Sequence, residues 1–280
     1  MISNNVVALY PRVLNFTYEV VNSLKGKKEA DERKFICEKL ATKIFLHAST
    51  IHHLRSGSNV TLEAYPNGSH VVDFASILVI TRAIFETYLN LFEIFFEPQN
   101  DDEFEYRYAV YQLRGLKIAE LTIQNNPMAE GQDVDFILQV QQRFKDIESL
   151  RNRIKRTSHF QTLDQNQQKA SLEGSLFPKR NRDDLAKEAG FGKKSFQQIY
   201  AYLSGYTHGD SLSIIQIKDA VSDEEKDSFI RLSMGLVMMV LSHLILNYAR
   251  KFPQARAVCD AQPANRNLVV ILAKQASSME

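Results

Sequence analysis

The stretch Leu78-Val-Ile-Thr-Arg-Ala-Ile-Phe-Glu-Thr-Tyr-Leu-Asn-Leu91 indicates the fold more clearly than any other part of the chain. Apolar side chains cover most of the helix that it predicts, and Arg82, Glu86 and Asn90 recur at the i, i+4, i+8 spacing of a single face. A charge buried without a partner is strongly unfavourable. We therefore expect Arg82 and Glu86 either to pair with each other or to bind a polar ligand.

Outward from this helix, the sequence predicts further long helices separated by clear stop and start signals. Pro98 ends the apolar helix, and the acidic turn Asn100-Asp-Asp-Glu103 is typical of a helix start. Two capping-box patterns, Ser195-x-x-Gln198 and Ser222-x-x-Glu225, mark two later helix starts. These signals predict an all-α protein, a bundle of five to six long helices with a polar irregular insertion near residues 160–194.

We expect residues 1–280 to form a single all-helical domain. In this interpretation residues 1–28 hold an N-terminal helix, residues 30–252 the core bundle, and residues 253–280 a C-terminal helix or tail. Only Ser213–Lys218 alternates in the manner of a strand, and a lone short strand has no partner, so we interpret it as an extended connection.

Composition excludes several classes of protein. The formal charge of +1 gives no general reason to expect nucleic acid or an anionic membrane as partner, and two cysteines, Cys37 and Cys259, do not make a disulfide framework. The N-terminal residues lack the pattern of a signal peptide, so we expect a cytoplasmic protein. The apolar runs 71–96 and 232–248 contain polar or charged residues, which favours buried helices over membrane spans. We expect no cofactor and no metal site.

A second polar stripe lies more than a hundred residues further along the chain. Tyr200, Ser204 and His208 share one face of a predicted helix that ends at Gly209. A histidine in the last helical turn feels the negative end of the helix dipole, which favours the imidazolium form. The stripe is either a reactive site, with His208 as an acid or phosphate ligand, or a well-capped helix end.

Positive charge is concentrated between residues 143 and 182. Ten basic residues face four acidic ones in this segment: Arg143, Lys145, Arg151, Arg153, Lys155, Arg156, Lys169, Lys179, Arg180 and Arg182 against Asp146, Glu148, Asp164 and Glu173. Such a segment could bind RNA or an acidic protein partner, although the interleaved aromatic residues are too sparse for a base-stacking platform. The alternative is an ordinary solvated face.

The two stripes together resemble a bacterial all-helical family known only as a domain of unknown function. The resemblance rests on Arg82-x-x-x-Glu86 and on Tyr202-Leu-Ser-Gly-Tyr-Thr-His208-Gly209, and it covers roughly residues 40–250. It implies an all-helical fold in which Arg82, Glu86, Ser204 and His208 are the signature positions. It implies no activity.

A more distant similarity is to HEPN proteins, helical bundles that often cut RNA with an arginine and a histidine four to six residues apart. Arg153-Ile-Lys-Arg-Thr-Ser-His159 meets that loose spacing, but Ile154 stands where the family usually has a small polar residue. The similarity implies Arg153 and His159 as an alternative pair of RNA-binding residues.

Three functions follow as hypotheses. One is a helical enzyme that processes RNA or another phosphodiester in bacterial stress or defence, with Arg82, Glu86, Ser204 and His208 as catalytic residues, and with Asn90, Tyr200, Arg153 and His159 in binding. The second is a non-catalytic helical interaction or structural module, with a second copy of the chain in a homodimer as a candidate partner. The third is a sensor of a small anionic ligand or nucleotide. The enzyme hypothesis requires that the two stripes meet in the folded chain.

Overall fold

The computed structural model describes residues 5–25, 32–62, 65–124, 134–175, 181–208, 210–211, 214 and 222–278. The chain divides into two compact units, which we call unit 1 (Met1–Leu91 with Asp183–Glu280) and unit 2 (Phe92–Arg182). No Gly- or Pro-rich linker marks the first boundary, because α3 passes directly into a π-helical turn at that point. For this reason the sequence alone predicts a single domain. The two units are described separately below.

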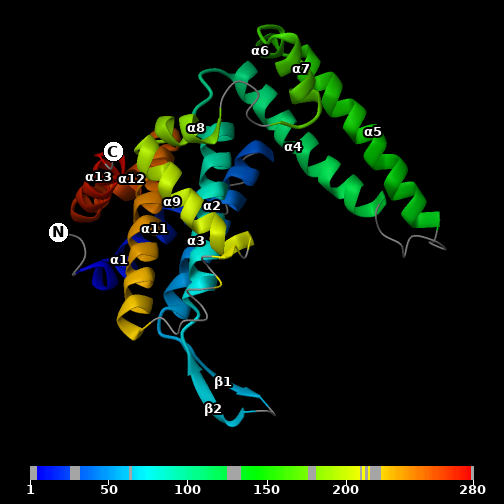
Figure 1. Ribbon diagram of the computed structural model, residues 1–280. Coiled ribbons are helices and arrows are strands. Elements are labelled where there is room, and N and C mark those ends of the chain that lie inside the picture. The colour runs from blue at the N-terminus through cyan, green and yellow to red at the C-terminus, as the bar shows by residue number, and fades with distance from the viewer. Residues whose placement is uncertain are drawn as a thin grey trace. The chain divides into compact units, whose positions relative to one another are not determined.

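Unit 1 is a helical bundle with one β-hairpin (Figure 1). Its elements are α1 (Val6–Asn22), α2 (Glu32–Leu54), β1 (Ser58–Leu62), β2 (Tyr65–Val71), α3 (Phe74–Leu91), α9 (Lys193–His208), α11 (Asp223–Lys251), α12 (Pro253–Ala261) and α13 (Pro263–Ser278), with the short α8 (Arg182–Glu188) beginning at its edge. Helix α11 contacts α1, α3, α12 and α13, and is therefore the centre of this bundle.

Helix α11 has the length and composition of a core helix with well-defined ends. Ser222 and Glu225 form the predicted capping box, and the helix ends at Lys251 just before Pro253. Twelve of its residues are buried. Among them, the Tyr248 ring packs on Phe252 and its hydroxyl lies 4.0 Å from the thiol of Cys37. The buried α11 is therefore the helix against which α3 packs, and α9 packs in turn against α3.

Helix α3 is buried on most sides, as its sequence predicts. Ile77, Leu78, Ile84 and Leu89 are fully or almost fully buried, and the helix contacts α2, α11 and α9. The contact with α9 includes the ring of Phe85, whose centroid lies 5.9 Å from that of Phe196. These contacts fix the orientation of α3, and they therefore also fix the direction in which its polar stripe faces.

The β-hairpin between α2 and α3 is a feature that the sequence analysis missed. Strands β1 and β2 pair antiparallel, with Ser58 opposite Val71 and Leu62 opposite Tyr65. The backbone enters the hairpin through Gly57, whose φ of 72° is one that other residues rarely adopt. The segment Tyr65-Pro-Asn-Gly-Ser69 of β2 has the composition of a turn, and a two-stranded hairpin has too little periodicity to stand out in a helical sequence.

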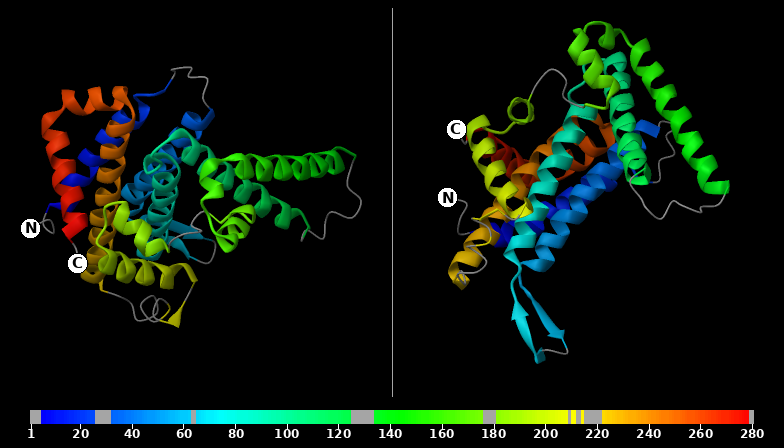
Figure 2. Two further views of the ribbon diagram at one scale, coloured as in Figure 1. Left: turned by 90° about the horizontal axis from the view of Figure 1, so that it is seen from above. Right: turned by 45° about the vertical axis from the view of Figure 1, so that its right-hand side comes forward.

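Unit 2 consists of η1 (Phe92–Phe96), α4 (Asp101–Gln124), α5 (Val134–Arg156), α6 (Ser158–Gln161) and α7 (Gln165–Leu172). Helices α4 and α5 lie side by side, with α6 and α7 packed at one end (Figure 2). Apolar side chains of α4, α5, α6 and the turn after α6 form its core: Tyr106, Ala109, Val110, Leu113, Ile147, Leu150, Ile154, Phe160 and Leu163, with Leu172 of α7 partly buried against it.

Helix starts in unit 2 follow the sequence signals. The side chain of Asn100 accepts the backbone N–H of Glu103 at 2.9 Å, and Glu103 Oε2 accepts that of Gln99 at 2.9 Å. Asp164 and Gln167 form a capping box at the start of α7. The described part of the region near residues 160–194 holds the short helices α7 and α8, joined by turns and irregular segments.

The all-α prediction is confirmed, with two local differences. Helix α9 begins at Lys193, two residues before the predicted capping box, because the N–H of Phe196 already bonds to Gly192 O at 2.9 Å. The connection predicted at Ser213–Lys218 lies outside the described residues, except for Ile214, which is helical. The expected helices of the C-terminal segment are present as α12 and α13.

Two stretches within the described residues are long and apolar enough to cross a membrane, Phe74–Phe96 and Asp223–Lys251. More than half of each apolar window, 56% and 61%, is buried inside the structure. Length and composition alone are weak evidence for a membrane span, because core helices of other proteins share them.

Candidate functional site

The packing of α3 against α9 brings the two polar stripes together. The helices run antiparallel, since Phe74 lies near Tyr206 (ring centroids 6.1 Å apart) while Phe85, further along α3, lies near Phe196, earlier in α9. Arg82 and Glu86 of α3 then face Tyr200 and His208 of α9. We call these four residues the Arg82 centre.

The hydroxyl of Tyr200 links the two charged residues of α3. It accepts hydrogen bonds from Arg82 Nε at 3.2 Å and Nη2 at 2.9 Å, and it donates a short bond to Glu86 Oε1. Arg82 Nε also bonds directly to Glu86 Oε1 at 3.1 Å. The Arg82 guanidinium lies 5.0 Å from the centre of the Tyr200 ring, within the range of a cation–π contact. Tyr200 therefore fixes both the position and the plane of the guanidinium.

His208 completes the centre. Its Nε2 lies 3.1 Å from Arg82 Nη1. An arginine guanidinium can only donate, so the facing nitrogen must accept and the ring proton of His208 must be on Nδ1. The contact therefore requires a neutral imidazole, whereas the helix-end argument favours the imidazolium. A second proton on His208 would remove this bond and place two cations side by side.

Burial divides the Arg82 centre into a closed side and an open side. The Arg82 side chain is 14% exposed, Glu86 is 43% exposed, and His208 is exposed. Desolvation acts to lower the pKa of Arg82, but the hydrogen bonds and charges of Tyr200 and Glu86 outweigh it and raise that pKa. The bonds just described use three of the five N–H donors of the guanidinium. An anion that approaches beside His208 can take up the others.

The structure does not bring every predicted site residue into this centre. Ser204 Oγ donates to the carbonyl of Tyr200 one turn earlier at 2.7 Å, so it closes a local helical bond instead of pointing its proton at His208. The side chain of Asn90 makes no hydrogen bond to the centre among the described residues. Gly209 lies outside the described residues. The geometry therefore gives no support to Ser204 as a nucleophile activated by His208.

Arg153 and His159, the pair with HEPN-like spacing, belong to unit 2 and have separate partners there. Arg153 bonds to Glu105 Oε1 at 2.6 and 3.0 Å and to Gln112 Oε1 at 3.2 Å. The ring of His159 packs on Tyr106, with centroids 4.7 Å apart. Arg153 and His159 thus contact different residues of α4. Their predicted role in binding RNA stays a prediction.

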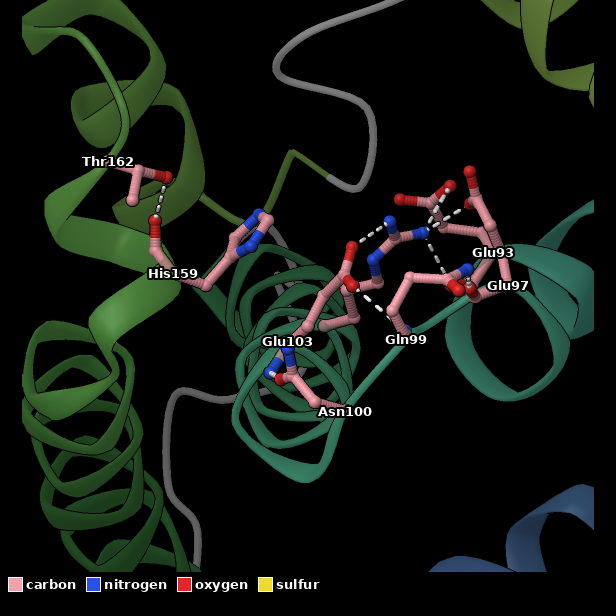
Figure 3. A network of polar contacts seen from close by, with 8 residues as sticks. Glu93, Glu97, Gln99, Asn100, Glu103, His159 and Thr162 are labelled. Carbon is pink, nitrogen blue, oxygen red and sulfur yellow. Dashed lines mark hydrogen bonds and ion pairs between the residues drawn. The ribbon is translucent and has the colours of Figure 1, made fainter.

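Unit 2 contains a second arginine–carboxylate cluster that the sequence analysis did not single out. Arg107 pairs with Glu93 at 3.0 Å and makes short bonds to Glu97 and Glu103, and we call these four residues the Arg107 cluster. Figure 3 shows its carboxylates converging on one guanidinium, while the ring of His159 extends from α6 toward α4. All four side chains are buried or nearly so, with exposures of 7–19%.

The π-helical turn explains how Glu93 and Glu97 reach this cluster. The N–H of Glu97 bonds to Phe92 O, five residues earlier, at 3.0 Å. This wider turn changes the direction of the following side chains, and Arg107 Nη1 also bonds to Glu93 O at 2.8 Å. Two sequence features could have indicated the cluster. One is the i, i+4 pair of Glu103 and Arg107, and the other is Glu93, a single charged residue within the apolar stretch Phe92–Phe96.

Desolvation raises the pKa of Glu103, but the bond from Gln99 N–H and the charge of Arg107 outweigh it, so the pKa is lowered overall. Desolvation likewise acts to lower the pKa of Arg107, and its three carboxylates raise it. Arg107 and Glu103 are therefore both ionised, and the carboxylates of the cluster more than compensate the charge of its arginine. No group of three or more His, Cys, Asp or Glu residues in the described part of the chain has the arrangement of a metal site.

Comparison with known proteins gives one match. A family model described as a family of unknown function (DUF5677) matches residues 41–227, more than half of the chain. The matched range includes all four residues of the Arg82 centre. No curated protein and no solved structure matches the chain.

Proposed function

Starting from the fact that the chain belongs to DUF5677, a family of unknown function, we propose that its Arg82 centre binds and cleaves an RNA phosphodiester, in the manner of HEPN-like proteins. The observation that carries this proposal is the 3.1 Å contact between Arg82 Nη1 and His208 Nε2 at the surface of unit 1. It places a permanent cation beside a neutral imidazole, which are the two groups that phosphodiester cleavage needs.

Each residue has a distinct part in the proposed reaction. A phosphate bound by Arg82 takes over the N–H that His208 now accepts, and this leaves the lone pair of Nε2 available. His208 then removes the proton of a ribose 2′-hydroxyl, whose oxygen forms a bond to phosphorus as the bond from phosphorus to the 5′-oxygen breaks. The leaving oxygen takes a proton from water, the hydroxide so formed takes the proton from His208, and the products are a 2′,3′-cyclic phosphate and a 5′-hydroxyl. Arg82 stabilises the charge that develops on the non-bridging oxygens.

Glu86 and Tyr200 support this arrangement without contacting the phosphate. Tyr200 bonds to two nitrogens of Arg82, which directs Nη1 toward His208. Glu86 balances the charge of the guanidinium when no anion is bound. These are positioning residues, since their bonds are made to Arg82 and to each other.

One experiment tests the proposal directly. Purified protein is incubated with mixed single-stranded RNA, and cleavage is compared between wild type, His208→Ala and Arg82→Lys. We expect both variants to lose cleavage, while His208→Ala keeps its unfolding midpoint because His208 is exposed. His159→Ala is the matched control and should cleave normally. An intact RNA with wild-type protein, or loss of cleavage only in His159→Ala, would contradict the proposal.

A second candidate function is a non-catalytic helical module in which the Arg82 centre only joins α3 to α9. The observation in its favour is that Arg82, Glu86, Tyr200 and His208 bond to one another. In that case Arg82→Ala lowers the free energy of unfolding by about 1–3 kcal/mol, the usual range for hydrogen bonds to charged groups, and no RNA is bound by any variant. Binding of RNA that depends on Arg82 would exclude it.

A further inference from the structure

A cleft in unit 2 has no part in the function proposed above. It is open, has a volume of about 730 Å³, and lies among α5, α6 and α7. All of its lining residues belong to Phe92–Arg182, so the cleft is complete within one unit. Its volume lies within the range of about 300–1,000 Å³ that is usual for sites that bind small molecules.

Two lysines line the cleft, Lys155 on α5 and Lys169 on α7. Both are exposed, and neither forms an ion pair within the described part of unit 2. The two lysines come from different helices and line the same cleft, which gives the cleft positive charge on both sides of the gap between α5 and α7. Lysine is a common ligand of phosphate groups.

The acidic residues of the cleft are already paired with other cations. Glu148 bonds to Arg151 at 2.6 Å. Glu173 makes a short ion pair with Lys117 and lies 3.6 Å from Arg151. Arg151 and Lys117 therefore compensate the two carboxylates, and the charges of Lys155 and Lys169 remain for a ligand.

Amide side chains provide a second kind of recognition. Gln161, Gln165 and Gln168 also line the cleft. The Gln161 amide nitrogen donates to Lys155 O at 2.8 Å, and that of Gln168 donates to Phe160 O and Leu163 O at 3.2 Å each. Their amide oxygens accept no hydrogen bond from a described residue. These bonds hold the amides in place, with their oxygens available to accept the N–H groups of a base.

We infer that this cleft is a second, separate binding site, and that it takes a nucleoside phosphate, with the phosphate on Lys155 and Lys169 and the base on the glutamine amides. The nucleoside phosphate is either a free nucleotide or a residue of an RNA strand, because the two present the same groups. The inference does not rest on the proposed function, since no residue of the Arg82 centre lines the cleft.

The test uses the full chain with three probes: inorganic phosphate, AMP and a short single-stranded RNA. Lys155→Gln/Lys169→Gln should weaken binding of AMP or of RNA by about tenfold or more. It should also reduce the slope of log affinity against log salt concentration by the amount expected for about two phosphate contacts. The matched control is Lys145→Gln/Arg156→Gln, which removes the same charge from exposed positions of α5 outside the cleft. The control should stay within about twofold of wild type.

Binding of AMP identifies a free nucleotide as the source, and binding of RNA alone identifies a strand. The inference is overturned if no probe binds, if the control variant loses as much affinity as the cleft variant, or if inorganic phosphate binds as tightly as AMP. His208→Ala separates the two proposals, because it should lose RNA cleavage and keep the affinity of the cleft.

Discussion

The Arg82 centre and the Arg107 cluster begin from the same local pattern and end in different chemistry. Each has an arginine and a glutamate at i, i+4 on one helix, Arg82 with Glu86 on α3 and Arg107 with Glu103 on α4. Arg107 is enclosed by three buried carboxylates, whereas Arg82 has one half-exposed carboxylate and faces an exposed histidine.

The difference shows that the partners, and not the pair itself, decide what an arginine can do. In the Arg107 cluster the positive charge is more than compensated, so a further anion is repelled. In the Arg82 centre one acid balances the arginine, and the remaining contact is to a group that can take up a proton. The buried cluster is suited to holding η1 on α4, and the open one is suited to binding an anion.

The largest expected effect is the loss of Arg107. Arg107→Ala removes the cation that three buried carboxylates share and should lower the free energy of unfolding by about 3–5 kcal/mol. Arg153→Ala is the matched control in the same unit, because its pair with Glu105 is about one-third exposed. Arg153→Ala should lower the free energy of unfolding by less than about 1 kcal/mol. Urea unfolding measures the free energy of unfolding of both variants. Similar midpoints would show that the buried Arg107 cluster stabilises the fold no more than an exposed ion pair does.

Acid should affect the two units at different pH. In unit 1, burial lowers the pKa of His243 to about 4, from an ordinary value of 6.5. Since its folded pKa is depressed, the unfolded chain binds the proton first. Stability is then lost as the pH falls from about 6.5 to about 4, by up to about 3 kcal/mol. In unit 2 the pKa of Glu103 is lowered below its ordinary 4.5, so that contribution is kept until the pH falls below this value.

Amide hydrogen exchange, measured by peptide at pH 7 and pH 5, reports each unit separately. We expect protection in unit 1 to fall at pH 5 while protection in unit 2 is kept, and His243→Gln should remove most of the change. Equal loss of protection in both units at pH 5 would contradict this assignment.

A smaller effect is expected from Tyr200→Phe, which keeps the ring under Arg82 and removes only the hydroxyl. The bonds to Arg82 and Glu86 are lost, and the free energy of unfolding should fall by about 1–2 kcal/mol. RNA cleavage should fall more than RNA affinity, because the guanidinium stays charged but is no longer directed toward His208. Tyr202→Phe, on another face of α9, is the control, and a cleavage rate equal in both variants would count against a positioning role for Tyr200.

The smallest change in stability is expected from Glu86→Gln, because Glu86 is 43% exposed. The free energy of unfolding should change by less than about 1 kcal/mol. Removal of the acid leaves the charge of Arg82 uncompensated, so RNA should bind more tightly and with a steeper dependence on salt. Weaker binding by this variant would show that Glu86 contacts the ligand itself.

The sequence predicts the helices of this chain well, because apolar spacing and capping residues are local signals. The i, i+4 spacing of Arg82 with Glu86 and the i, i+8 spacing of Tyr200 with His208 also identify both halves of the Arg82 centre. What the sequence cannot give is the antiparallel packing of α3 on α9, since that depends on contacts such as Phe85 with Phe196 between distant segments. The role of Tyr200 as the link follows only from that packing.

Other features depend on backbone geometry without a local signal. The π-turn at Phe92–Phe96 redirects Glu93 and Glu97, and nothing in the sequence FEIFF marks the wider turn. Ser204 looks like a nucleophile by spacing alone, but its hydroxyl has a nearer acceptor in its own helix. The Tyr200 carbonyl is a nearer acceptor for the Ser204 hydroxyl than the His208 ring is. Residue spacing alone does not show which of these two acceptors the hydroxyl uses.

The most direct test of the account is the protonation state of the His208 ring nitrogens, measured by ¹⁵N NMR of histidine-labelled protein near neutral pH. We predict an unprotonated Nε2 and a proton on Nδ1 in wild type, a changed Nε2 signal in Arg82→Ala, and an Nε2 that changes its signal but stays unprotonated when a non-cleavable RNA is bound. A proton on Nε2 in the free protein, or a His208 spectrum that does not respond to Arg82→Ala, would contradict it.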